Sequence, residues 1–175
     1  MQEHDLWNHN NYSIPPENLA PLEECLRELM PWELWVKQDR MLGYRFHQQA
    51  EKGMVFFQPS EPAGLLAKTL DRLRKQHPDL DTALVGLERL PADHNDHNGF
   101  IVKSVEEWES RLAGFHKAAR ERPEWRLTVV NVLRPGDKEA LTDRLYQAWL
   151  RIGLLGPIRN TFEMQCVNPA AASVE

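Results

Sequence analysis

The feature that most constrains the fold is one apolar segment in the C-terminal third of the chain. Residues 127–133 read Leu-Thr-Val-Val-Asn-Val-Leu, and β-branched residues favour extended backbone. Apolar residues fill almost every position instead of alternating with polar ones, which is typical of a strand buried on both faces. We therefore expect a β-sheet with this strand near its centre and helices packed on it.

Helical and extended patterns alternate along the rest of the chain. Apolar residues at three- and four-residue spacing predict helices over residues 15–30, 60–76, 104–122 and 137–152. Ser104 and Glu107 have the spacing of a capping box at the start of the third helix. Extended patterns predict a hairpin over residues 43–58 and strands over residues 82–87, 100–102 and 158–167. This order favours an α+β or α/β fold, a single domain in which a mixed β-sheet with an N-terminal hairpin carries about four helices.

The domain organisation follows from the distribution of polar residues. Residues 1–14 are polar and lack periodicity, so we expect a flexible N-terminal arm. Residues 15–168 are expected to form one globular α+β domain, and residues 169–175 a frayed tail. We find no internal repeat and no long linker between halves.

Composition and charge restrict the class of protein. Of 175 residues, 42% are hydrophobic and 27% are charged, which is usual for globular proteins. There is no apolar run long enough to span a membrane and no secretory signal, so we expect no membrane partner. The net charge is −5, and nucleic-acid binding, although not excluded, is not favoured because it requires a basic surface. A neutral or basic protein partner fits this charge better.

The two cysteines, Cys25 and Cys166, lie at opposite ends of the chain in apolar surroundings. Neither belongs to a CxxC motif for metal binding or redox chemistry. We interpret them as reduced core thiols and expect a cytoplasmic protein.

Metal-ligand residue types gather in one polar segment. The candidates are Asp93, His94, Asp96 and His97. Their spacing faintly resembles a calcium-binding loop, but Val105 stands where such a loop needs a bidentate glutamate. We assign neither a metal site nor a cofactor, and these four residues remain the candidates if one exists.

Catalytic motifs are absent. The chain has no Gly-x-Ser-x-Gly nucleophile motif and no glycine-rich phosphate loop. Two histidines are candidates for acid–base catalysis, His47 on an expected strand and His116 on an expected helix. The sequence shows no partner for either one, so we assign no catalytic residue.

Two kinds of side chain are candidates for binding. Basic residues at helical spacing could contact phosphates. These candidates are Lys68, Arg72, Lys75 and Arg120. Acidic residues between them favour a surface whose charges neutralise one another. Tryptophan is enriched in protein interfaces. The candidates for protein interaction are the tryptophans at element ends or in the expected arm, Trp7, Trp32 and Trp35.

No motif is specific enough to indicate a known family. Our leading hypothesis is a cytoplasmic, non-catalytic protein-interaction module: an adaptor, an inhibitor or neutralising partner, or an accessory subunit of an assembly. The alternative is an enzyme, a hydrolase or nuclease among the options, whose His/carboxylate site is assembled from distant residues. A second alternative is a nucleic-acid-binding accessory protein. The oligomeric state stays open.

Overall fold

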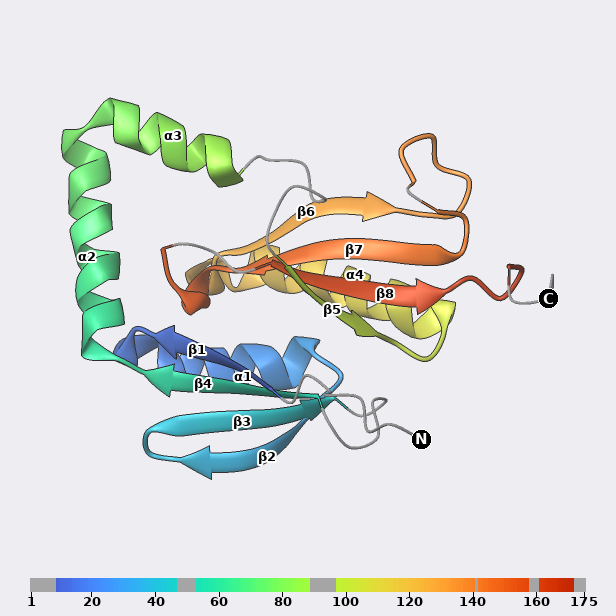
Figure 1. Ribbon diagram of the computed structural model, residues 1–175, viewed down its shortest axis with the longest axis horizontal. Coiled ribbons are helices and arrows are strands. Elements are labelled where there is room, and N and C mark those ends of the chain that lie inside the picture. The colour runs from blue at the N-terminus through green and yellow to red at the C-terminus, as the bar shows by residue number, and fades with distance from the viewer. Residues whose placement is uncertain (1–8, 47–52, 89–96, 141, 158–160, 172–175) are drawn as a thin grey trace, which may run out of the picture.

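The computed structural model describes residues 9–46, 53–88, 97–140, 142–157 and 161–171. The described helices are α1 (Leu19–Leu29), α2 (Glu61–Gln76), α3 (Pro78–Glu88) and α4 (Val105–Glu121). The first sheet contains β1 (His9–Ile14), β2 (Trp32–Gln38), β3 (Met41–Phe46) and β4 (Met54–Pro59). The second contains β5 (His97–Ile101), β6 (Leu127–Leu133), β7 (Leu145–Ile152) and β8 (Thr161–Val167). Figure 1 shows one sheet above the other, with α1 and α4 behind them.

The two sheets are built in the same way. Their strand orders are β1-β4-β3-β2 and β5-β8-β7-β6. In each sheet the first strand pairs in parallel with the last one, and the other pairs are antiparallel. The chain therefore consists of two strand–helix–three-strand units, which α2 and α3 connect. The expectation of no internal repeat is wrong, because the repeat lies in topology and leaves only a short trace in sequence, His9-Asn10-Asn11-Tyr12 against His97-Asn98-Gly99-Phe100.

The first strands of the two units meet through side chains. Asn10 Nδ2 donates a hydrogen bond to Asn98 Oδ1 at 2.6 Å, and Asn98 Nδ2 donates to the Tyr12 hydroxyl. Asn10 and Asn98 occupy the same place in the two repeats. Their contact therefore joins equivalent positions of the two units.

A single hydrophobic core joins both units. It includes Leu26 of α1, Phe115 of α4 and residues from one face of each sheet. Trp32 lies where the two units pack together. Its ring contacts Phe46 of its own unit, with ring centroids 5.0 Å apart, and Phe162 of the other unit, with centroids 5.1 Å apart.

The α+β fold with mixed sheets and four described α-helices confirms the predicted fold class. The β3–β4 hairpin and the helices α1, α2 and α4 lie where they were expected. The capping box is also present, since Ser104 Oγ accepts the backbone N–H of Glu107 at 3.1 Å.

Three predicted elements are wrong. Residues 145–152 form strand β7 and not a helix; the helix was expected because Leu145, Ala148 and Ile152 happen to have helical spacing. Residues 82–87 belong to helix α3, whose first turn follows Pro78. Residues 127–133 form β6, an edge strand and not a central one. β6 is apolar on both faces because some of its side chains pack in the main core and others pack against Trp149.

The expected N-terminal arm is corrected for residues 9–14, which form β1. Their polarity arises because Asn11 and Ser13 face solvent on one side of the strand, whereas Ile14 is buried. The described part of the expected tail, residues 169–171, forms a turn.

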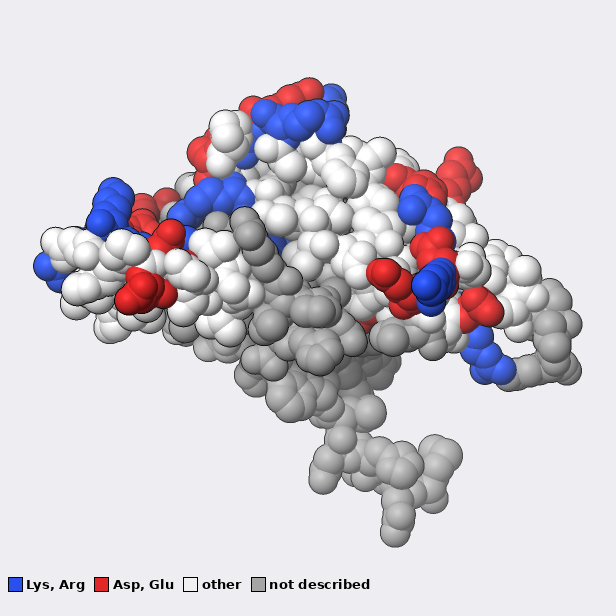
Figure 2. Space-filling view, turned by 90° about the horizontal axis from the view of Figure 1, so that it is seen from above, with Lys and Arg blue, Asp and Glu red and all other residues white. Residues whose placement is uncertain are grey.

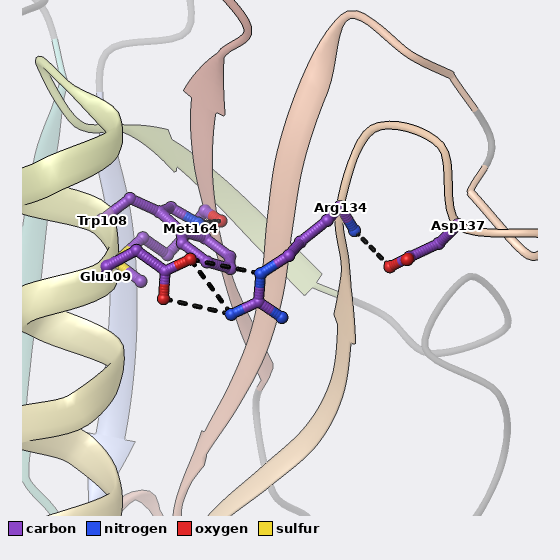
Figure 3. A network of polar contacts seen from close by, with 5 residues as sticks. All are labelled: Trp108, Glu109, Arg134, Asp137 and Met164. Atoms are coloured by element: carbon purple, nitrogen blue, oxygen red, sulfur yellow. Dashed lines mark hydrogen bonds and ion pairs between the residues drawn. The ribbon is translucent and has the colours of Figure 1, made fainter.

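A polar network replaces the helix start that was expected at Asp137 (Figure 3). Asp137 Oδ2 accepts the backbone N–H of Arg134 at 2.7 Å, and Gly136 has a φ of +88°, which glycine tolerates. The Arg134 guanidinium binds Glu109 of α4 at 3.1 Å and lies over the ring of Trp108. Trp108 Nε1 in turn donates to the carbonyl of Met164. The turn after β6 is therefore fixed to α4 and β8.

Among the described residues, no helix combines the length and the apolar character that a membrane crossing requires.

The packing predicts a large effect for one tryptophan and a small one for its neighbour in the same strand. Trp32 is 7% exposed and Trp35 is 46% exposed. We expect Trp32→Ala to lower the free energy of unfolding by about 3–5 kcal/mol, because it leaves a cavity between the two units. Trp35→Ala should cost less than about 1 kcal/mol. Urea unfolding followed by circular dichroism measures both, and equal losses would contradict this account of the core.

Candidate functional site

Helices α1 and α4 cover one face of both sheets, and we call the opposite face, which is turned toward the viewer in Figure 1, the front face. Strand alternation decides which side chains lie on it. On the second sheet, the core-facing residues Phe162 and Met164 alternate with Thr161 and Glu163. The front face of this sheet therefore carries polar residues.

Several of these polar front-face side chains are buried. They are Gln147, Arg151, Thr161 and Glu163, each at most 5% exposed. Burying polar groups without partners is unfavourable, so a cluster of this kind requires internal contacts or a ligand.

Glu163 is the centre of this cluster. Its Oε1 accepts a hydrogen bond from Gln147 Nε2 at 2.6 Å. Its Oε2 lies 3.1 Å from His97 Nε2. Gly99 stands opposite Glu163 on β5, and a Cβ atom there would lie 3.7 Å from the same Oε2. A histidine and a carboxylate from different strands therefore meet on the front face.

Two buried polar atoms of the cluster have no hydrogen-bond partner among the described residues: Gln147 Oε1 and Trp149 Nε1. An unsatisfied buried group costs about 1–3 kcal/mol, and native proteins contain few of them. The same holds for Trp32 Nε1, the Tyr44 hydroxyl and Trp125 Nε1 in the core, so these atoms do not by themselves mark a ligand site.

The first unit has different residues at the equivalent front-face positions. The strand registers put Phe56 at the place of Glu163 and Arg45 at the place of Arg151. His9 occupies the place of His97 in the repeat, and the structure describes His9 by its strand position alone. Among the described side chains of the front face, His97 and Glu163 are a histidine and a carboxylate in contact.

The distance between His97 Nε2 and Glu163 Oε2 is that of a hydrogen bond, and it also equals the separation of two ligand atoms on one divalent ion. Two ligand atoms that are each about 2.1 Å from one ion are separated by about 3.0–3.4 Å in octahedral or tetrahedral coordination. The 3.1 Å between His97 Nε2 and Glu163 Oε2 lies within that range. Within the described part of the chain, no group of three His, Cys, Asp or Glu side chains is present, so any further donor must come from elsewhere.

Of the four metal candidates from the sequence, His97 alone is described, and its neighbour in space is Glu163. Asp93, His94 and Asp96 lie outside the described residues. So does His47, whereas His116 is exposed on α4, the helix that covers the other face.

The binding candidates are also dispersed. Trp32 is buried in the core, which removes it from the surface, and Trp7 lies outside the described residues. The basic candidates lie on two different helices: Lys68, Arg72 and Lys75 on α2, and Arg120 on α4, which packs on a different part of the sheet. In addition, Lys68 forms an ion pair with Glu17 at 3.5 Å. Figure 2 shows Lys and Arg side by side with Asp and Glu on the face that it views.

Sequence reasoning missed Glu163, Gln147, Trp149 and Arg151. One available signal was the alternation of Gln147, Trp149 and Arg151 with apolar residues along one segment, which is a strand pattern. Another was the His-Asn-x-aromatic sequence that begins both units.

Neither cysteine is activated for nucleophilic chemistry. Cys25 and Cys166 are free and buried. Burial raises the pKa of the Cys25 thiol to about 12, and burial together with Glu107 raises the pKa of Cys166. Since the thiolate is the reactive form, both thiols are inert near neutral pH.

No family model matches the sequence, and no curated protein matches it. Solved structures do resemble the fold. A lactoylglutathione lyase from Agrobacterium tumefaciens has a TM-score of 0.50 at 11% identity, over 94% of this chain and 96% of that chain. An integron cassette protein from the mobile metagenome of V. Cholerae has a TM-score of 0.50 at 8% identity, over 95% and 98%. A glyoxalase/bleomycin resistance protein/dioxygenase family enzyme from Burkholderia phytofirmans PsJN reaches 0.49 at 12% identity, over 92% and 98%.

At these identities the likeness is one of fold. It nevertheless corrects the leading hypothesis from the sequence, a non-catalytic interaction module, because the same fold is found in a lyase. The alternative hypothesis, an enzyme with a His/carboxylate site assembled from distant residues, agrees better with the fold and with the His97–Glu163 pair.

The thiol environments predict slow labelling in the folded protein. Burial shields both thiols and raises the pKa of each, so we expect Ellman's reagent to modify neither cysteine in minutes at pH 8, and both after unfolding in guanidinium. Absorbance at 412 nm measures the reaction. Rapid modification of the folded chain would show that a thiol is accessible and activated.

Proposed function

We propose that the protein is a metal-dependent enzyme that acts on a small molecule at the front face, with His97 and Glu163 as ligands of a divalent ion. The observation that carries the proposal is the His97–Glu163 contact inside a mostly buried polar cluster. Imidazole nitrogen and carboxylate oxygen are donors that suit zinc and neighbouring transition metals.

The surroundings of the pair support this assignment. Gln147 donates to the second oxygen of Glu163 and so fixes the orientation of the carboxylate, as outer-sphere partners of metal ligands commonly do. An ion here would act as a Lewis acid toward an oxygen of the substrate. The unpartnered Gln147 Oε1 and Trp149 Nε1 are groups that a substrate or water could satisfy.

We further propose His9 as a third donor. It holds the position in β1 that His97 holds in β5, and the Asn10–Asn98 contact fixes the two strands against each other. Two imidazoles and one carboxylate form a facial set that leaves other coordination positions open. The chain's own share of the chemistry is then to bind and orient the substrate and to exclude water.

Support for an enzyme that acts on small molecules comes from the fold shared with a lactoylglutathione lyase. A cytoplasmic location remains part of the proposal and is supported by the two free, buried thiols. The expected protein partner stays a prediction.

Metal binding tests the proposal directly. We expect the chelator-treated protein to bind one Co²⁺ per chain, and His97→Ala and Glu163→Gln each to weaken binding by more than about 100-fold, because loss of an outer-sphere partner alone costs 10–100-fold. Isothermal titration and the visible absorbance of Co²⁺ measure stoichiometry and affinity.

The matched control is His116→Ala, which removes an exposed histidine from α4 and should leave Co²⁺ binding unchanged. Thermal unfolding establishes that each variant is folded. A folded His97→Ala protein that binds Co²⁺ as tightly as the parent chain would overturn the assignment.

His9 has its own prediction. His9→Ala should weaken Co²⁺ binding at least tenfold and change the Co²⁺ absorbance, because the ion exchanges an imidazole for water. Asn11→Ala, two residues along the same strand, serves as its control. If both substitutions leave the spectrum and the affinity unchanged, His9 is not a ligand.

A further inference from the structure

Helices α2 and α3 connect the two units, and we call them the connector. Figure 1 shows them along the margin of the molecule, with α3 turned away from the direction of α2. Among the described residues 61–87, Gly64 alone is buried. It lies against η1 (Pro16–Asn18), since a Cβ atom there would be 3.1 Å from Pro16 Cδ. The connector is thus anchored near the start of α2, and the rest of it is exposed or half-buried.

The connector carries two stripes of leucines at helical spacing. They are Leu66, Leu70 and Leu73 on α2 and Leu80, Leu84 and Leu87 on α3. The four leucines nearer the corner between the helices are half-buried, whereas the outer ends are exposed, Leu66 by 47% and Leu87 by 58%. Short helices gain most of their stability by burying an apolar stripe. The outer ends of both stripes therefore call for apolar cover.

The two stripes match in length when one helix runs antiparallel to the other. The first and last leucines of each stripe are seven positions apart, which is about 10.5 Å at 1.5 Å per residue. An antiparallel alignment therefore places Leu66 opposite Leu87 and Leu73 opposite Leu80. This pattern is typical of two helices that pack on each other.

The α2 and α3 of one chain do not form this pair. His77 is the single residue between them, whereas antiparallel helices are usually joined by two to five residues. Its backbone is extended, with φ −132° and ψ 90°, as the following Pro78 favours. The short connection keeps the two helices open, and a connection of this kind favours the exchange of helices between two copies of a chain.

The charges of the two helices support the same pairing between copies. α2 has four bases and two acids, a net charge of +2, whereas α3 has three acids and no base, a net charge of −3. In the antiparallel alignment, Lys75 of one chain lies beside Asp79 of the other, and both residues are exposed in the single chain. Opposite charges at matching positions favour this partner and this register.

We propose that the connector is a dimerisation surface, on which α2 of one chain packs antiparallel to α3 of a second copy. A two-fold axis repeats the contact with the roles of the chains reversed. The two helices have 16 and 11 residues, and a stable interface engages about 20–30 residues of each partner. The connector is thus large enough to hold a dimer together, and the interface does not involve the His97–Glu163 pair.

A hollow beside Leu66 provides a place for the end of the partner helix. It has a volume of about 220 Å³, and its walls include Pro15, Ala63, Leu66 and Leu155. In the proposed register, Leu87 of the second copy lies opposite Leu66 and so enters this apolar hollow.

Sedimentation velocity and light scattering on the full chain test the proposal. We expect twice the chain mass of 20.4 kDa, with a dissociation constant in the micromolar range. Leu66→Asp and Leu87→Asp should each raise this constant at least about tenfold, because each buries a carboxylate in an apolar contact. The matched control is Leu34→Asp, which changes a leucine of β2 that is 41% exposed and should leave the constant within about twofold.

A charge exchange tests the register. Lys75→Glu and Asp79→Lys should each weaken the dimer about tenfold, because the exposed pair occurs twice in the interface. The double variant restores opposite charges across the interface and should recover the parent constant to within about threefold.

Cross-linking separates pairing between chains from pairing within one chain. A protein with Leu66→Cys and Leu87→Cys, treated with a short bismaleimide, should yield covalent dimers on a denaturing gel. A cross-link within single chains would show a closed helical hairpin and overturn the proposal. A parent chain that stays monomeric at about 1 mM would also overturn it, as would a Leu87→Asp protein, shown to be folded by thermal unfolding, that dimerises as tightly as the parent chain.

Discussion

The arrangement of the two units depends on the single hydrophobic core that joins them, and the side-chain hydrogen bond between Asn10 and Asn98 connects their first strands. β1 and β5 are each the last strand of their own sheet, and no described backbone pairing joins them. A side-chain amide supplies both a hydrogen-bond donor and an acceptor. The two asparagines can therefore connect the edge strands of the two sheets without backbone hydrogen bonds between those strands. Trp32 adds apolar packing across the same boundary. Together these contacts fix the position of one unit's front face relative to the other.

The two units share a backbone and differ in the residues of the front face. Where the second unit has Glu163, the first has Phe56. The equivalent arginines differ in burial. Arg151 is buried and donates a hydrogen bond to Thr161, whereas Arg45 is exposed and its guanidinium lies over the ring of Trp35. The front face of the second unit thus carries buried polar side chains, whereas that of the first carries the half-buried Phe56 and the exposed Trp35.

Local patterns in the sequence predicted what depends on local physics. The helix over residues 104–122 was identified because its cap and its apolar stripe agree, and the hairpin over residues 43–58 because of alternation and a turn. The helix expected over residues 137–152 failed because Leu145, Ala148 and Ile152 have helical spacing in a strand whose two faces are both buried. Glu163 could not be identified because its partners, Gln147 and His97, come from other strands. His97 was identified as a candidate metal ligand because it lies in a cluster of polar residues, but nothing in the sequence indicated Glu163 as its partner.

The central claim is that His97 and Glu163 bind one ion on the front face. Anomalous X-ray diffraction from crystals grown with Co²⁺ tests it most directly. The account predicts a single strong anomalous peak within about 2.0–2.2 Å of His97 Nε2 and of a Glu163 carboxylate oxygen. A structure with Co²⁺ in the crystal, no peak at this place and the His97–Glu163 hydrogen bond intact would contradict it.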